Sequence, residues 1–226
     1  MKESDNVTPH LSSEYDENVR KTIPYYECFH TETINFIEAA FPEPRIWLDT
    51  GGGTGFLIEK ALARFRETTF ILADPSPEML QIAKNKLGKN ERVKFLDPAG
   101  TQDLDLGFKV DVITAIQAHH YLTKEEREKA TKVCFDLLAP NGIYITFENI
   151  RPLSSEGVRL GKAYWSSFQL AKGRGINIVN EHMNRFDSAY FPITIDEHLQ
   201  LLRACGFKTA ELFWYSYMQA GFYGIK

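Results

Sequence analysis

The sequence predicts one α/β domain with a doubly wound, mostly parallel sheet of seven strands. Three observations lead to this prediction. Between Arg45 and Ile150, five β-rich runs alternate with helical patterns, which is typical of parallel strands connected by helices. A glycine-rich segment, TGGGTG, directly follows the first run. Two more β-rich runs close the chain, and we expect them to form an antiparallel hairpin.

Five strands and the helices between them are expected in the core. Ile58, Leu62 and Phe65 recur at helical spacing behind the first strand and mark the buried face of a helix. The expected strands are, in order, residues 46–48, 68–74, 92–97, 110–116 and 143–149.

Two core helices have clear end signals. Ser76 is expected to cap a helix whose first position is Pro77, and Gly88 is expected to close that helix. TKEE, from Thr123 to Glu126, is a capping box, in which the two end residues exchange side-chain and backbone hydrogen bonds. This box predicts a helix in front of the last core strand.

Four regions make up the predicted domain. Residues 1–44 are expected to form a helical cap, and residues 45–150 form the core. Residues 151–193 are irregular in pattern and rich in aromatic side chains, so we expect an insert or lid that completes the cap. Residues 194–226 begin with a second capping box, TIDE, and continue as a helix and two strands that we expect to separate near Gln219–Gly221.

Composition limits the classes of function. A net charge of −4 gives no electrostatic reason to bind nucleic acid or a membrane surface. The cysteines and histidines do not have metal-ligand spacing, so we expect no metal. No apolar run approaches the ~20 residues of a membrane span, and the polar N-terminus has no signal-peptide core. We therefore expect a cytoplasmic protein.

The glycine segment predicts a ligand site. It lies at the carboxyl end of the first strand, where α/β sheets bind ligands, and bare backbone lets a ligand approach closely. A dinucleotide loop would need a further glycine where Phe56 stands, and a P-loop would need GK[ST]. Asp49 would repel a phosphate and attract a cation. The residues of this predicted site are Asp49, Gly51, Gly52, Gly53 and Gly55.

Asp74 is the second acid of the predicted site. It ends the second strand about 20 residues after the glycines, where a carboxylate accepts hydrogen bonds from both ribose hydroxyls of an adenosine ligand. The alternative is an acid placed at a helix start by the helix dipole. Because Ser76 already caps that helix, the ribose interpretation is favoured.

Four stretches, LDTGGGTG, ADPSPEMLQIAKNKL, DVITAIQAHHYL and LLAPNGIYITFEN, together resemble the class I S-adenosylmethionine-dependent methyltransferases. The resemblance covers residues 45–150 and extends to the closing helix and hairpin. It implies the Rossmann-like methyltransferase fold, with S-adenosylmethionine as cofactor and S-adenosylhomocysteine as product. It also implies that Asp49 and the backbone of Gly51–Gly53 hold the cationic methionine part, and that Asp74 holds the ribose.

Further cofactor contacts follow from the same resemblance. Pro75 and Met79 would lie beside the cofactor, and Gln117 would line the sulfonium pocket. The acid that usually binds the adenine amino group falls on Ala99 here. Asp97, two residues earlier, is one replacement, and backbone near Gly100 is the other.

The N-terminal stretch YDENVRKTIPYY resembles the leading helix of small-molecule members of the family and of carboxy-S-adenosylmethionine synthases. That helix lies over the cofactor, so Tyr15, Arg20 and Tyr25 are candidates to close the site; an ordinary amphipathic helix is the alternative. Arg185 and Tyr190 stand near the place where the synthases keep an arginine for a carboxylate, although the spacing differs by a couple of residues.

Methyl transfer needs mainly positioning and exclusion of water, and a general base only where the acceptor must lose a proton early. His119 and His120 follow the fourth strand and are the candidate catalytic residues; packing histidines are the alternative. Acceptor recognition is expected in the N-terminal helices and in residues 151–193.

The predicted function is methyl transfer by in-line displacement to a small-molecule acceptor. Two alternatives stay open: an enzyme similar to carboxy-S-adenosylmethionine synthases, which modifies the cofactor itself for tRNA modification, and a non-catalytic cofactor-binding protein. The expected partner is a small-molecule substrate, with no membrane and no nucleic acid, and a homodimer is left open.

Overall fold

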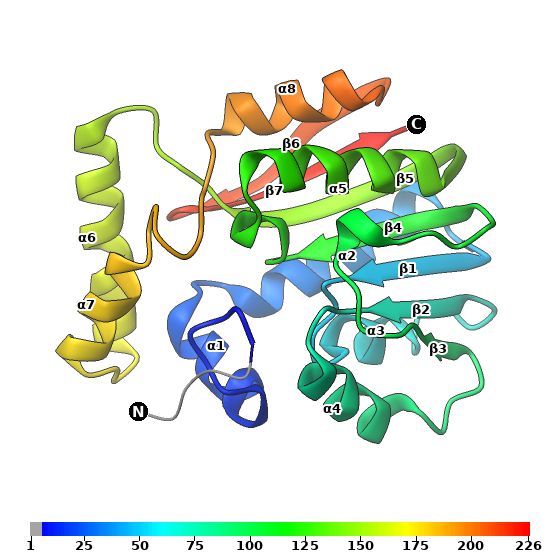
Figure 1. Ribbon diagram of the computed structural model, residues 1–226, viewed down its shortest axis with the longest axis horizontal. Helices are drawn as coiled ribbons and strands as arrows, with labels where there is room; N and C mark the ends of the chain where they lie inside the picture. The colour runs from blue at the N-terminus through cyan, green and yellow to red at the C-terminus, as the bar shows by residue number, and fades with distance from the viewer. Residues whose placement is uncertain (1–5) are drawn as a thin grey trace.

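Seven strands form one sheet in the order β3-β2-β1-β4-β5-β7-β6 in the computed structural model, which describes residues 6–226 (Figure 1). Strands β1 to β5 are parallel, and β7 runs antiparallel to both β5 and β6. The predicted fold class is therefore confirmed. The strands are β1 (Ile46–Thr50), β2 (Thr69–Ala73), β3 (Val93–Phe95), β4 (Val110–Ile116), β5 (Leu138–Asn149), β6 (Thr209–Ser216) and β7 (Gln219–Ile225).

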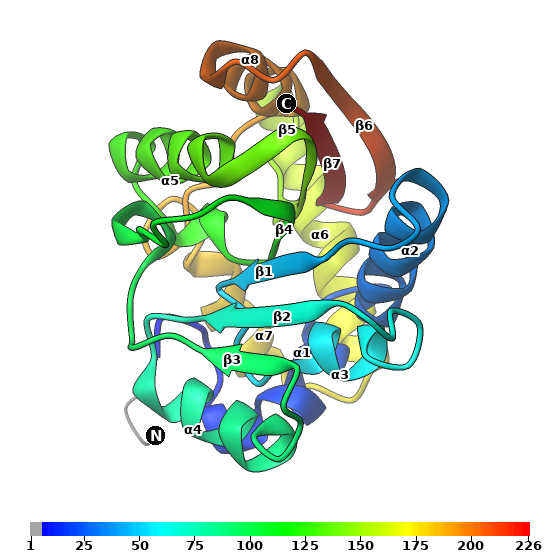
Figure 2. The ribbon, with the colours of Figure 1, turned by 90° about the vertical axis from the view of Figure 1, so that its right-hand side faces the viewer.

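Helices cover both faces of the sheet, as Figure 2 shows. Neighbouring strand residues point to opposite faces, so Trp47 packs in one core and Leu48 in the other. The first core contains side chains of α2 (Tyr26–Ala40), α3 (Phe56–Ala61) and α4 (Pro77–Leu87). The second contains side chains of α5 (Lys124–Leu137) and α8 (Ile195–Cys205).

The predicted helix caps are confirmed. The Ser76 hydroxyl accepts a hydrogen bond from the Met79 amide at 3.2 Å, and Pro77 is the first residue of α4. Both capping boxes are present, at Thr123 before α5 and at Thr194 before α8. Gly88 ends α4 in a right-handed conformation.

Two boundaries differ from the predictions. Helix α3 ends at Ala61, so Leu62 lies beyond it. The hairpin turns at Tyr217, where φ is 53°, and not near Gln219–Gly221. Gly221 lies inside β7, where a Cβ atom would come within 2.7 Å of the Phe147 ring. Gly221 leaves room for the Phe147 ring to pack against β7. Its role is in packing within the strand and not in the turn.

A helical cap lies at the carboxyl ends of the parallel strands, toward which their arrowheads point in Figure 1. It consists of η1 (Ser12–Glu14), α1 (Tyr15–Thr22) and the insert, whose irregular pattern hides two helices, α6 (Ser155–Ala171) and α7 (Ile176–Asn184). Trp165 of α6 is fully buried, and its Nε1 donates a hydrogen bond to the Thr22 carbonyl at 2.6 Å. The insert is thereby joined to the N-terminal helices.

No helix within residues 6–226 is long and apolar enough to cross a membrane. The same part of the chain has no group of three or more histidine, cysteine, aspartate or glutamate side chains arranged to hold a metal ion.

Candidate functional site

A cavity of about 490 Å³ lies at the carboxyl ends of β1, β2 and β4. A smaller pocket of about 20 Å³ adjoins it, and Tyr15, Gly51, Gly53 and Ile116 line both. The walls of the larger cavity are residues 6–8, Tyr15, Gly51, Gly53, 74–77, Met79, 100–102, 116–119, Tyr121 and Leu122. The glycine segment therefore lies between two spaces of very different size.

The glycine loop leaves no room for side chains at two positions. A Cβ atom on Gly51 would lie 2.5 Å from the Ala118 Cβ, and one on Gly52 would lie 2.8 Å from the Asp49 Oδ2. Gly51 also has a φ of +63°, which other residues rarely adopt. Gly55 differs, because a Cβ there would meet Leu87 of α4 at 2.7 Å. Gly55 thus allows two helices to pack and does not line either space.

Asp49 is a buried carboxylate, with 2% of its surface exposed, and it lines the smaller pocket. Its Oδ1 accepts a hydrogen bond from the Thr114 hydroxyl at 2.6 Å. Burial raises the pKa of Asp49 to about 7; the Thr114 hydrogen bond opposes this shift, and the charge of Asp74 adds to it. Within residues 6–226 no side chain forms an ion pair with Asp49. A ligand cation would supply the missing charge.

Asp74 lies on the wall of the larger cavity, with Pro75 and Met79. Its Oδ1 accepts a hydrogen bond from the Ser76 amide at 2.8 Å, and its Oδ2 accepts one from the Gly53 amide at 2.9 Å. Burial raises the pKa of Asp74, while these two hydrogen bonds lower it. Because each carboxylate oxygen has a second lone pair, the side chain both fixes the glycine loop and can accept further hydrogen bonds from the cavity.

Asp97 lies apart from the cavity, on the exposed surface. Gly100, Thr101 and Gln102 line the cavity at this end instead. The Oε1 of Gln102 is buried and has no hydrogen-bond partner among residues 6–226. An amide oxygen accepts a hydrogen bond from an amino group as a carboxylate does. Gln102 was not identified from the sequence, although a polar side chain two residues after Gly100 was a usable signal.

The three N-terminal candidates separate in the structure. Tyr15 lines both spaces. Arg20 is not among the lining residues; its Nε pairs with Glu27 at 2.7 Å. Tyr25 is 56% exposed and packs against the hairpin, so the structure does not bring it to the site. Its neighbour Tyr26, which was not predicted as a site residue, lines the smaller pocket.

Helix α1 is held over the glycine loop by Asp16. The Thr54 hydroxyl donates a hydrogen bond to Asp16 Oδ1 at 2.6 Å, and Lys86 of α4 forms an ion pair with Asp16 Oδ2. These contacts fix the helix that carries Tyr15 above both spaces. The structure therefore shows a covered site.

Gln117 and His119 both lie on the cavity wall. Gln117 has a φ of +57°, and its backbone amide donates to the Phe147 carbonyl at 2.7 Å. The His119 Nε2 lies 3.1 Å from the Thr101 hydroxyl, and its Nδ1 lies 3.0 Å from the Tyr144 hydroxyl. Burial lowers the pKa of His119 to about 4. Both ring nitrogens are thus occupied by protein groups.

His120 lies behind the cavity wall and is not among the lining residues. Its Nδ1 pairs with Glu148 at 2.7 Å, and its Nε2 lies 3.1 Å from the Asn149 amide nitrogen. Glu148 also accepts hydrogen bonds from the backbone amides of His119 and His120. Burial alone would raise the pKa of Glu148, but hydrogen bonds and charge from His120 lower it to about 2. This carboxylate holds the turn after β4 in place.

The comparisons with known proteins agree with this geometry. A family model described as a methyltransferase domain matches residues 48–144. The carboxy-S-adenosyl-L-methionine synthase of Trichodesmium erythraeum is 25% identical over 201 residues, which cover 87% of this chain and 79% of that protein.

Two solved structures show the same fold. An amino pentose methyltransferase of Micromonospora echinaspora with bound S-adenosylmethionine matches with a TM-score of 0.64 and 18% identity, over 93% of this chain and 95% of that chain. Human N-acetylserotonin methyltransferase, also in complex with S-adenosylmethionine, matches with a TM-score of 0.60 and 15% identity. That match covers 95% of this chain but only 58% of the human chain.

The burial of Asp49 predicts a pH-dependent stability. Its pKa is raised from 3.8 in a free chain to about 7 in the folded protein, so the folded state holds the proton more tightly. Protonation of Asp49 therefore contributes to the free energy of unfolding. This contribution is fully present below pH 4 and is lost as pH rises through about 7. We expect Asp49→Asn to raise the free energy of unfolding by about 2–4 kcal/mol at pH 8 and to change it little at pH 4.

Urea unfolding at both pH values measures this difference. Asp97→Asn on the exposed surface is the matched control, and we expect the same stability as wild type at both pH values. An equal effect of Asp49→Asn at pH 4 and pH 8 would show that the buried charge is not responsible.

Proposed function

The chain belongs to the class I S-adenosylmethionine-dependent methyltransferase family, and we propose that it transfers a methyl group from this cofactor to a small-molecule acceptor. One observation carries the proposal: the carboxylate of Asp49 is buried beside a bare glycine loop without a cation of the protein to neutralise it. Such a site favours a ligand with an ammonium group and disfavours a pyrophosphate.

The residues around the two spaces fit the parts of S-adenosylmethionine. Asp49 and the glycine loop would hold the methionine part, and Asp74 would accept the ribose hydroxyls. Gln102, with its unpaired Oε1, would accept a hydrogen bond from the adenine amino group in place of Asp97. Gln117 lies on the wall of the larger cavity, and we propose it for the pocket of the sulfonium.

S-adenosylmethionine supplies a methyl carbon that is already activated by the positive sulfur. The protein then needs to hold the acceptor in line with that carbon and to exclude water. In this structure the nitrogens of His119 and His120 all have protein partners, so neither ring is placed to take a proton from an acceptor. We therefore propose catalysis by positioning, without a histidine base.

The cover over the cavity supports a small acceptor. Residues 6–8 and Tyr15 of the N-terminal segment, with Tyr121 and Leu122, contribute to the wall of the cavity. A volume of about 490 Å³ must hold the adenosine part and the acceptor together, which suits a compact molecule. The small-molecule class of the acceptor, the possible homodimer and the cytoplasmic location stay predictions from the sequence.

A second candidate function is that of an enzyme similar to the carboxy-S-adenosylmethionine synthases. Two buried polar atoms favour it: the Arg185 Nε and the Tyr190 hydroxyl have no hydrogen-bond partner among residues 6–226. A carboxylate would satisfy both. The Nη2 of Arg185, however, donates to the Val7 carbonyl at 2.7 Å, and Val7 rather than Arg185 lines the cavity. Arg185 would reach a ligand only after the N-terminal segment shifts.

Isothermal titration with S-adenosylhomocysteine tests the cofactor site. We expect wild type to bind this product and not NAD. Asp49→Asn should weaken binding by about 100-fold or more, because it removes the charge partner of the buried ammonium. Asp97→Asn is the control and should bind within twofold of wild type. Binding of NAD without binding of S-adenosylhomocysteine would overturn the proposal.

Mass spectrometry of the nucleoside that copurifies with the protein separates the two enzymatic candidates. The methyltransferase proposal predicts S-adenosylmethionine or S-adenosylhomocysteine in both wild type and Arg185→Met. A carboxylated, heavier cofactor that is present in wild type and lost in Arg185→Met would establish the second candidate. Tight cofactor binding without methyl transfer to a broad panel of acceptors would instead favour a non-catalytic protein.

A further inference from the structure

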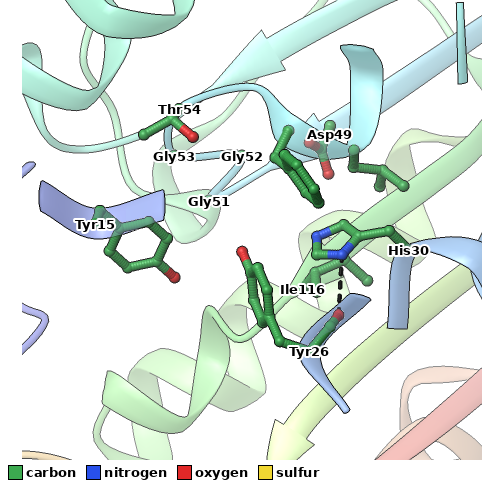
Figure 3. Close-up of a pocket in the computed structure, with 11 residues that line it drawn as sticks. Tyr15, Tyr26, His30, Asp49, Gly51, Gly52, Gly53, Thr54 and Ile116 are labelled. Carbon is green, nitrogen blue, oxygen red and sulfur yellow. Dashed lines mark hydrogen bonds between the residues drawn. The ribbon is translucent and has the colours of Figure 1, made fainter. Parts of the chain in front are cut away.

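The smaller pocket contains a histidine that the proposed function does not use. His30 of α2 is 2% exposed and lines this pocket together with Asp49 (Figure 3). Figure 3 shows the two side chains on the same side of the pocket, facing Tyr15 across it. His30 lies in a different element from the glycine loop, about twenty residues earlier in the chain, and no spacing pattern connects the two.

The hydrogen bond of His30 Nδ1 determines the state of the other ring nitrogen. Nδ1 lies 3.1 Å from the Tyr26 carbonyl oxygen, which can only accept, so Nδ1 carries the proton. Burial lowers the pKa of His30 to about 4, and the ring is therefore neutral at pH 7. The Nε2 atom then has a lone pair and no proton. No hydrogen bond joins Nε2 to another side chain or backbone group among residues 6–226.

The pocket has the size and the lining of a site for one ammonium group. A volume of about 20 Å³ accommodates a single water-sized group, and –NH₃⁺ is of that size. Asp49 and His30 both line it, and the ring nitrogen of His30 that is not bonded to the Tyr26 carbonyl is available as an acceptor (Figure 3). The rings of Tyr26 and Phe56 form further walls. Aromatic faces also attract cations. The lining contains no lysine or arginine.

The nearby cations lie outside the pocket. Lys60 and Arg20 each lie 4.8 Å from the centre of the Phe56 ring, and both pair with Glu27. The single Glu27 carboxylate neutralises one of these two charges, and neither cation is among the residues that line the pocket. A ligand cation in the pocket would favour the ionised form of Asp49 and would meet the unprotonated Nε2 of His30.

We propose that His30 is a binding residue for the α-ammonium of the cofactor's methionine part, with its Nε2 as a second acceptor beside the Asp49 carboxylate. This assignment rests on the proposed function. Asp49 supplies the opposite charge. His30 orients the ammonium group, because a neutral imidazole accepts one hydrogen bond along its lone pair. Together they make the free amino group a requirement for tight binding.

The test compares two ligands in each protein: S-adenosylhomocysteine and its analogue without the α-amino group. In wild type the analogue should bind more weakly than S-adenosylhomocysteine. His30→Phe should weaken S-adenosylhomocysteine by about tenfold or more, as expected for a lost hydrogen bond to a charged group. The same change should leave the affinity for the analogue within twofold. His30→Gln, which keeps an acceptor oxygen, should lose less than His30→Phe.

His198→Phe is the matched control. His198 is a buried histidine of α8 that packs on Phe222 in the second core, away from both spaces, and this variant should bind both ligands as wild type does. Nitrogen-15 NMR of the wild-type protein needs no variant: the His30 Nε2 signal should shift on addition of S-adenosylhomocysteine and should stay unchanged with the analogue.

Each other outcome identifies which claim has failed. If His30→Phe weakens both ligands equally, His30 only supports the shape of the pocket and the assignment is wrong. If wild type binds the two ligands with equal affinity, the pocket does not hold the ammonium, although the cofactor site stands. If wild type binds neither ligand, the proposed function itself fails, and the assignment of His30 fails with it.

Discussion

The burial of one carboxylate, that of Asp49, is the constraint on which the rest of the site depends. The end of β1 places Asp49 beneath the glycine loop, where the Thr114 hydroxyl from the adjacent strand β4 is the one hydrogen-bond donor to its side chain among residues 6–226. The loop must be bare because any side chain on Gly52 would collide with the same carboxylate. Burial without a counter-ion raises the pKa of Asp49, and the ionised side chain lowers the stability of the folded protein. Such a cost in stability is frequent at functional sites.

The cap converts this sheet edge into two separate spaces. Helix α1 is joined to the loop and to α4 through Asp16, and it places Tyr15 between the small pocket and the large cavity. The small pocket suits a charged group of defined size, and the large cavity suits an adenosine and an acceptor. Helix α6 supports α1 from behind through the hydrogen bond from Trp165 to Thr22. The insert therefore contributes to the site through the position of α1.

Features encoded within a few neighbouring residues could be predicted from the sequence, and features that depend on packing between distant elements could not. The strands, the caps at Ser76, Thr123 and Thr194, and the positions of Asp49 and Asp74 at strand ends all follow from local patterns. Tyr25 was chosen in place of Tyr26 because the rotation of α2 is set by the core, which turns Tyr26 inward. Gln102 lies in the same loop as Gly100, but which of the loop's side chains turns toward the cavity depends on packing. His30 reaches the site only through the tertiary fold, and no short motif contains it.

Carbon-13 NMR titration of the Asp49 carboxyl group, with and without S-adenosylhomocysteine, tests the central claim most directly. The claim is that the buried Asp49 carboxylate pairs with the cationic group of a bound ligand. In the free protein we expect Asp49 to titrate with a pKa of about 7. Saturation with S-adenosylhomocysteine should lower this pKa strongly, because the ammonium stabilises the ionised form. A pKa that stays unchanged on saturation would contradict the pairing of Asp49 with a cationic ligand.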